Sequence, residues 1–140
     1  MAALTLAVER LAAATVLSCH GALVAASAMQ LETALSQVLL RPQVRIVVDL
    51  AAVAAADYTG VTMLRVTAGI AAEQGGSLVL AAPNAQVVHT LRECGVLSTF
   101  PTYRTVQAAL DGDAGALIAE PEPAPAPAGW PVNQSDRRTA

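Results

Sequence analysis

Apolar residues follow two periods along the chain, and segments of one period alternate with segments of the other. Short runs of apolar and β-branched residues are typical of buried strands, whereas apolar positions three and four apart are typical of one helix face. The short runs predict strands at residues 14–18, 44–50, 77–81 and 100–103. The helical spacing predicts helices at residues 31–39, 61–73, 83–95 and 105–110.

The strand expected at residues 44–50 has the strongest signal. Its run Val-Arg-Ile-Val-Val-Asp-Leu is almost continuously apolar, which is typical of a central strand covered on both faces. Glycines at Gly21, Gly75-Gly76 and Gly95 predict turns between elements. Strands that alternate with helices imply right-handed crossovers, so the expected fold class is α/β with a largely parallel or mixed sheet.

The length of 140 residues fits one domain, which we expect to span residues 1–117. Residues 118–140 differ in composition, because five of the eight prolines lie between Pro121 and Pro131. A Pro/Ala-rich segment with so few large apolar side chains cannot form a core, and it favours extended conformations. We therefore expect a disordered tail.

Composition excludes some classes of protein. Hydrophobic residues make up 54% of the chain and charged residues 14%, which is not the composition of a disordered protein. The net charge is −3, all eight basic residues are arginines, and aromatic residues make up only 3%. Direct nucleic-acid binding needs clustered cations or aromatic stacking platforms, so we expect none.

Residues 11–31 carry no formal charge, and two interpretations of this segment are open. A length of this kind, with the small residues Ala26-Ser27-Ala28, is compatible with a secretory or membrane segment. Against this, His20, Gln30 and other polar residues would have to enter the hydrocarbon layer. We favour the division into a strand and a helix, and predict a cytoplasmic protein without membrane insertion.

The residue types that carry catalysis are present but poorly arranged. Cys19 and His20 are neighbours on an expected strand, so their side chains point to opposite faces. His89 and Cys94 lie five apart on an expected helix, which is off the spacing that makes helical neighbours. We therefore predict no metal, no cofactor and no enzymatic activity.

The motif Asp57-Tyr58-Thr59-Gly60 lies between the central strand and a helix expected to begin at about Gly60. Either Asp57 or Thr59 has a side chain that can cap the helix start, which explains both residue types structurally. Alternatively, a phosphate added to the hydroxyl would be tolerated beside the positive end of the helix dipole. Its charge would repel a partner shaped for a neutral hydroxyl, which describes a binding switch.

The following helix has two apolar stripes. Val61, Leu64, Ala68 and Ala71 form one, and Met63, Val66 and Ile70 form the other. A helix buried on one side needs only the first stripe. The second stripe indicates either deep burial or a surface that binds a partner or a second copy of the chain.

Several short segments, taken in order, resemble the STAS domains, a family named for sulfate transporters and anti-sigma factor antagonists. The resemblance rests on Gly21-Ala22-Leu23, Val47-Val48-Asp49-Leu50, Asp57-Tyr58-Thr59-Gly60, Gly75-Gly76, and Cys94-Gly95-Val96-Leu97 followed by Phe100-Pro101. It implies a four- to five-stranded mixed sheet with helices mainly on one side. For single-domain members it also implies cytoplasmic antagonism of an anti-sigma factor.

The same resemblance assigns roles to the motif. The family's usual sequence is Asp-Ser-Ser-Gly, and an ATP-dependent serine/threonine kinase that is itself the anti-sigma factor phosphorylates the residue before Gly. Thr59 is then the acceptor, Asp57 shapes the loop, and Gly60 lets the kinase approach the backbone. Tyr58 departs from the pattern, since a bulky phenol replaces a small residue.

Two hypotheses of different classes follow. In the first, the unphosphorylated protein binds an anti-sigma factor and lets go when Thr59 is phosphorylated; Asp57, Tyr58, Thr59, Gly60, Met63, Val66 and Ile70 form the binding surface. In the second, the protein is a structural STAS subunit of a membrane-associated transport assembly that uses the Met63, Val66 and Ile70 face without phosphorylation.

Overall fold

One mixed sheet organises the chain in the computed structural model, which describes residues 4–12, 14–41, 43–97 and 101–118. Its strands are β1 (Leu4–Arg10), β2 (Thr15–Leu23), β3 (Arg45–Ala56), β4 (Ser77–Ala81) and β5 (Thr102–Tyr103). The helices are α1 (Ala28–Val38), α2 (Tyr58–Glu73), α3 (Ala85–Glu93) and α4 (Val106–Asp111), with short 3₁₀ turns at Ala25–Ser27 and Ala114–Ala116.

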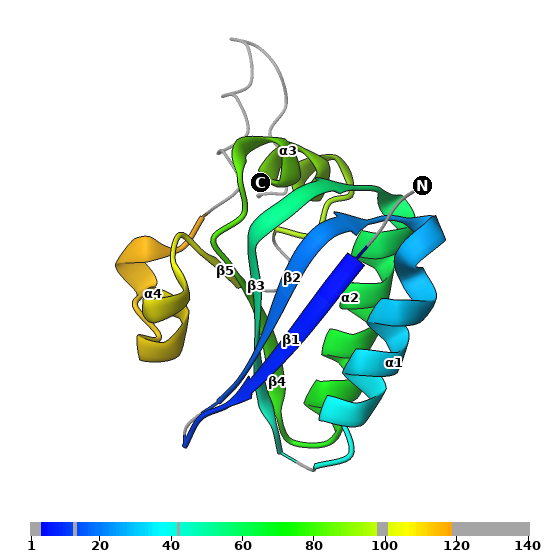
Figure 1. Ribbon diagram of the computed structural model, residues 1–140. Coiled ribbons are helices and arrows are strands. Elements are labelled where there is room, and N and C mark those ends of the chain that lie inside the picture. Colours follow the sequence, from blue (N-terminus) through cyan, green and yellow to red (C-terminus); the bar gives the residue numbers. More distant parts are fainter. Residues whose placement is uncertain (1–3, 13, 42, 98–100, 119–140) are drawn as a thin grey trace, which may run out of the picture.

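The spatial order of the five strands follows the order of the chain, β1-β2-β3-β4-β5. β1 pairs with β2 in antiparallel fashion, and every later pair is parallel. Helices α1 and α2 lie along one face of the sheet, whereas α4 lies on the other (Figure 1). The structure confirms the α/β class and the mixed sheet with helices mainly on one side.

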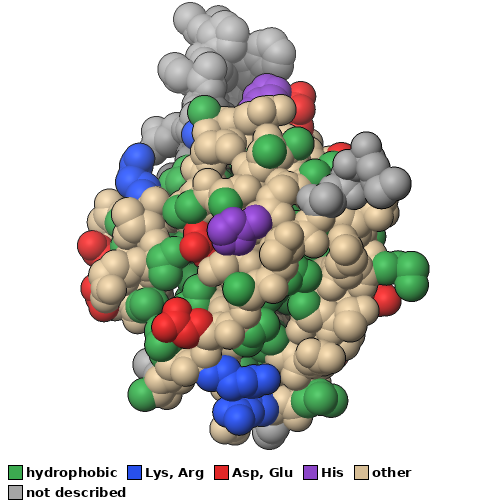
Figure 2. Space-filling model, in the orientation of Figure 1, with side chains coloured by type: hydrophobic (Ala, Val, Ile, Leu, Met, Phe, Trp, Pro, Cys, Tyr) green, Lys and Arg blue, Asp and Glu red, His purple; other side chains and the backbone are tan. Residues whose placement is uncertain are grey.

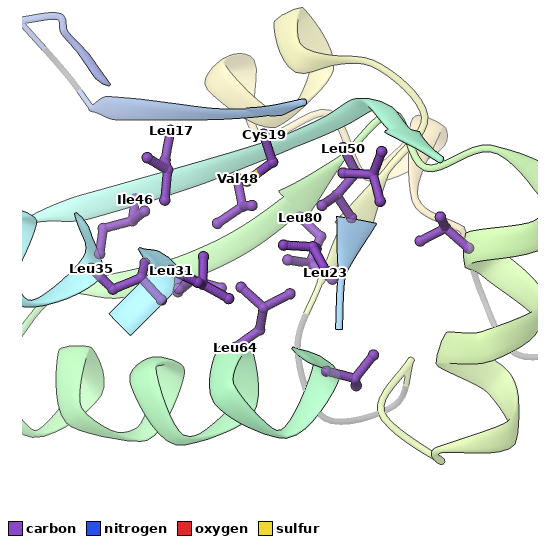
Figure 3. Packing of buried hydrophobic residues seen from close by; sticks show 14 of the residues in the cluster. Leu17, Cys19, Leu23, Leu31, Leu35, Ile46, Val48, Leu50, Leu64 and Leu80 are labelled. Atoms are coloured by element: carbon purple, nitrogen blue, oxygen red, sulfur yellow. The ribbon is translucent and has the colours of Figure 1, made fainter. Parts of the chain in front are cut away.

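The main core fills the space between the sheet and α1, α2 and α3. Figure 3 shows Leu64 of α2 reaching toward the sheet, close to Leu31 of α1, while Leu80 and Val48 point down from the strands. These side chains are at most 1% exposed. Burying an aliphatic side chain of this size stabilises the fold by about 1.5–3 kcal/mol, so this layer fixes where α2 lies.

A smaller core lies on the opposite face, beneath α4. Val47 and Val79 of the sheet pack there against Ala108 and Ala109. The Thr105 hydroxyl accepts a hydrogen bond from the backbone N–H of Ala108 and so caps the helix start.

Several elements differ from the sequence-based expectation. β1 was not among the predicted strands, because only Leu4 and Leu6 of this edge strand pack against the main core. β2 does not end at Gly21 but continues to Leu23. Gly21 adopts a φ of 117° within the strand, and the pairing with β3 shifts in register between Gly21 and Ala22. β3 likewise continues to Ala56, and β5 is shorter than residues 100–103, of which Phe100 lies outside the described residues.

The uncharged segment at residues 11–31 contributes to the fold. β2 pairs on both sides, and Leu17, Leu23 and Leu31 are almost completely buried. None of the helices in the described ranges has the length and hydropathy needed to cross a membrane. At the other end, the N–H of Ile118 donates to the Thr102 carbonyl at 2.7 Å, and the rest of the expected tail, residues 119–140, lies outside the described residues.

Candidate functional site

The motif at residues 57–60 forms the junction between β3 and α2. Asp57 is the N-cap residue of α2, and its Oδ1 accepts a hydrogen bond from the Gly60 N–H at 2.9 Å. Its other oxygen, Oδ2, accepts from the N–H of Ala25 at 3.1 Å. Of the two capping candidates, the structure selects Asp57. The helix therefore begins at Tyr58 rather than at Gly60, and Thr59 lies inside its first turn.

Gly60 packs against the end of β2. A Cβ atom at this position would lie 2.1 Å from the Leu23 carbonyl oxygen, so no larger residue fits without moving the backbone. The same oxygen accepts a hydrogen bond from the Asp57 N–H at 3.0 Å. The space that the missing side chain of Gly60 leaves is thus filled by the backbone of the same chain, and Gly60 is buried. That Gly60 lets a kinase approach the backbone stays a prediction.

Thr59 and Tyr58 face outward. Both side chains are exposed, and the Tyr58 side chain retains 63% of its accessibility. The packing of Asp57 and Gly60 against the β2 end therefore presents the next two side chains on a fixed first turn. The Thr59 side chain is thus open to solvent, and the unpaired N–H groups of a helix start favour negative charge nearby.

A groove runs beside this turn between α1 and α2. Its volume is about 300 Å³, and it is lined by Glu32 of α1 together with Tyr58, Thr59, Thr62, Met63 and Val66 of α2. The wall is mainly apolar, and Glu32 is its only charged side chain among the described lining residues. A groove of this kind fits an apolar side chain from a partner.

The two stripes of α2 have different environments. Val61, Leu64 and Ala71 are buried, which confirms the inner stripe. Val66 is 53% exposed and Ile70 is 39% exposed, whereas Met63 is half-buried and packs against the main core. The deep-burial explanation of the second stripe is therefore wrong for Val66 and Ile70.

The cysteines and histidines occupy separate places. Cys19 is buried and His20 is exposed, as their positions on one strand predict. Burial, and secondly the negative charge of Asp49, raise the pKa of the Cys19 thiol to about 12. His89 has a carboxylate partner that the sequence analysis missed, since its Nε2 lies 3.4 Å from Glu93 one helical turn away. Both side chains of that pair are largely exposed.

Charged side chains are scattered over the face of the molecule shown in Figure 2, and the basic ones occupy only small areas of it. This face carries no extended basic patch of the kind that binds nucleic acid. Within the described ranges, no three His, Cys, Asp or Glu side chains come together in a way that would hold a metal ion.

A family model for the STAS domain matches residues 5–109. The chain belongs to the STAS domain family. The match begins in β1 and ends in α4, so it includes the sheet apart from Leu4, and the α1–α2 groove. Among curated proteins no match is found.

Three solved structures with a similar fold are of anti-sigma factor antagonists. One from Mycobacterium paratuberculosis has a TM-score of 0.71 and 27% identity, over 79% of this chain and 93% of that chain. One from Planctomyces limnophilus has a TM-score of 0.68 and 19% identity, over 76% of this chain and 96% of that chain. The antagonist SpoIIAA in its unphosphorylated form has a TM-score of 0.66 and 18% identity, over 79% of this chain and 97% of that chain.

Proposed function

We propose that this STAS protein is a cytoplasmic anti-sigma factor antagonist, a regulatory binding protein rather than an enzyme. The observation that carries the proposal is the apolar groove between α1 and α2, which opens directly beside the exposed hydroxyl of Thr59. The likeness to the Mycobacterium paratuberculosis antagonist, which extends over 93% of that protein, supports the same role.

The binding surface is the outer side of α2. Val66 and Ile70 expose apolar side chains there, and Tyr58 adds an exposed ring at the start of the helix. Aromatic and apolar side chains that lose water on binding supply most of the affinity of such contacts. Tyr58, the departure from the family motif, thus adds contact area beside the acceptor.

Phosphorylation of Thr59 is the switch. The phosphate would bring a charge of about −1.5 to −2 to the rim of the apolar groove, opposite the carboxylate of Glu32. A partner that places apolar groups in the groove would then have to remove water from that charge, which weakens the complex. The partner we propose is an anti-sigma factor of the ATP-binding serine/threonine kinase type, which releases the sigma factor when the antagonist binds.

Two variants of the acceptor test the switch. Thr59→Ala should bind the partner as the wild type does and accept no phosphate, whereas Thr59→Asp should weaken binding at least about tenfold, equivalent to about 1.4 kcal/mol. Thr90→Asp provides the matched control, because it places the same charge on α3, away from the groove. Equal affinities of Thr59→Ala and Thr59→Asp for the isolated partner would rule out the switch.

The binding face is tested separately. Val66→Asp and Ile70→Asp should each abolish capture of the partner and leave the free energy of unfolding within about 0.5 kcal/mol of the wild type. Leu40→Asp is the control, since Leu40 is an apolar residue that is 80% exposed outside the groove. If Leu40→Asp abolished binding as completely as Val66→Asp and Ile70→Asp do, the α2 face would not be the specific binding surface. Sedimentation of the wild type and of the same variants measures their molecular mass in solution. A dimeric wild type whose Val66→Asp and Ile70→Asp variants are monomers would show that a second copy of the chain binds this face.

Affinity purification from the native cells, with mass spectrometry of partners and phosphopeptides, separates the two classes of function. A kinase-type partner and phosphate on Thr59 support the antagonist. Co-purification of a transporter ATPase with unmodified Thr59 would contradict the antagonist function. That result would favour the second hypothesis, in which the protein is a structural subunit of a membrane-associated assembly.

A further inference from the structure

A second pocket lies at the carboxyl ends of β4 and β5, between α3 and the segment that follows β5. Its volume is about 420 Å³, and the described residues that line it are Pro83, Ala85, Val88, Arg92, Arg104 and Ile118. None of these residues belongs to the α1–α2 groove. Pockets of this volume hold small molecules, and in sheets of parallel strands the carboxyl edge is a usual place for them.

One wall of the pocket is a single face of α3. Ala85, Val88 and Arg92 are three and four residues apart, so their side chains lie along the same side of the helix. A helix rises about 1.5 Å per residue, so this wall is about 10 Å long. Another wall is Ile118, whose N–H donates to the Thr102 carbonyl at 2.7 Å and is thereby held beside β5. The pocket is therefore longer than a lone phosphate or carboxylate group.

Two arginines give the pocket a positive charge. Arg92 lies in the last turn of α3 and Arg104 directly follows β5, and both side chains are exposed. Among the described residues, no carboxylate forms an ion pair with either guanidinium. Glu93, the neighbour of Arg92 in the sequence, contacts His89 at 3.4 Å instead. An anion in this pocket would therefore meet two cations whose charge the described chain leaves uncompensated.

A smaller pocket at the amino ends of β2 and β3 also contains two arginines, but one of them is engaged. Its volume is about 200 Å³, and Arg41 and Arg45 are among its lining residues. The Arg45 guanidinium donates hydrogen bonds to backbone carbonyls at the end of α4. Within the described ranges, the side chains of Arg92 and Arg104 donate no such hydrogen bonds, so both guanidiniums retain their donors for a ligand.

We propose that the pocket beside α3 binds a phosphate monoester of a small apolar group, with the phosphate paired to Arg92 and Arg104. Such a phosphate carries a charge of about −1.5 to −2, which matches two guanidiniums, whereas a carboxylate would compensate only one. The fork of N–H donors on each guanidinium also fits phosphate oxygens. The apolar part of the ligand packs against Pro83, Val88 and Ile118, which are all half-buried.

The bound ligand connects two parts of the fold. Arg92 belongs to α3 and Arg104 to the segment after β5, so a phosphate paired to both holds that segment to the helix. The site shares no residue with the surface proposed for the anti-sigma factor, so its occupancy is independent of the antagonist function.

A titration of the ¹⁵N-labelled full-length protein tests the proposal, with phenyl phosphate as the probe. The amide signals of Val88, Arg92 and Arg104 should shift along one saturable curve. Inorganic phosphate has the charge without the ring, and benzoate has the ring with a single charge; each should bind at least about tenfold more weakly. Absence of shifts at these amides would overturn the site. Equal affinities for phenyl phosphate and inorganic phosphate, or for phenyl phosphate and benzoate, would overturn the monoester.

Variants of the two walls provide the second test. Arg92→Gln/Arg104→Gln should weaken phenyl phosphate binding at least about tenfold, and Val88→Ala should weaken it while leaving the affinity for inorganic phosphate unchanged. Arg41→Gln is the control, because it removes the same charge from the smaller pocket, and it should bind phenyl phosphate as the wild type does. An equal loss of affinity in Arg41→Gln would show that only the net charge of the protein matters, and would overturn the proposal.

Discussion

The carboxylate of Asp57 accepts a hydrogen bond from the backbone N–H of Ala25 across a separation of 32 residues. The same side chain caps α2 through Gly60, so it fastens the start of that helix to the turn after β2. The first turn of α2 therefore keeps one position relative to α1, and the groove between the two helices keeps its shape. The motif's acidic residue is in this way a structural support for the exposed Thr59.

Replacing Asp57 with Ala should destabilise the protein. The variant loses an N-cap, which costs about 0.5–2 kcal/mol, and leaves the Ala25 N–H without its partner. Asp57→Asn keeps an acceptor oxygen for the cap, and we expect it to recover at least about half of the loss. Urea unfolding measures both values; a wild-type stability for Asp57→Ala would contradict this role.

Gly60 and Gly69 lie on the same helix and should respond in opposite directions to alanine. Gly60→Ala places a methyl group against the Leu23 carbonyl and should cost more than about 2 kcal/mol. Gly69→Ala meets no atom within 4 Å and should stabilise the protein by about 0.5–1 kcal/mol. Thermal unfolding of the two variants measures both changes in stability. Equal shifts of the unfolding temperature in the two variants would show that the contact of Gly60 with Leu23 is unimportant.

The buried thiol of Cys19 predicts a loss of stability at high pH. Its pKa is raised from 9.0 to about 12, so the unfolded chain releases this proton at lower pH than the folded protein does. The contribution is fully present below pH 9.0 and is lost as pH rises toward about 12. Between about pH 8 and 10.5, the wild type should lose about 2 kcal/mol more than Cys19→Ala in urea unfolding. Parallel pH profiles of the two proteins would count against it.

Arg45 should hold α4 on the sheet. Its guanidinium donates hydrogen bonds to the carbonyls of Leu110, at 3.0 Å, and of Ala109, at the carboxyl end of that helix. Charged donors at a helix end are favourable, and Arg45→Gln should cost about 1.5–3 kcal/mol. Native-state hydrogen exchange of the α4 amides should then quicken about tenfold or more, while Arg41→Gln leaves it unchanged. Exchange that stays slow in Arg45→Gln would show that α4 is held by its apolar contacts alone.

Local patterns sufficed to predict the centre of the fold. The apolar run around Val47 and Val48 marks β3 because a strand buried on both faces has few polar residues. The spacing of Val61 and Leu64 likewise marks the inner side of α2. β1 gives no such signal, because Val8 of this edge strand is 44% exposed and the strand is defined mainly by its pairing with β2.

The site was predictable only in part for a related reason. The sequence alone places Asp57 and Thr59 at the start of a helix, since capping depends on neighbouring residues. The contact of Gly60 with Leu23 and the groove between Glu32 and Met63 arise from the packing of distant segments. No local pattern in one sequence encodes such distances.

The match between strand order and chain order has a consequence for biosynthesis. Each strand after β1 pairs with the strand that precedes it in the chain. In this order of the described strands, no later strand has to be inserted between two earlier ones. On the ribosome, where synthesis proceeds at about 5–20 residues per second, every new strand meets an edge that is already complete. The sheet can therefore grow from its amino-terminal hairpin outward, one strand at a time.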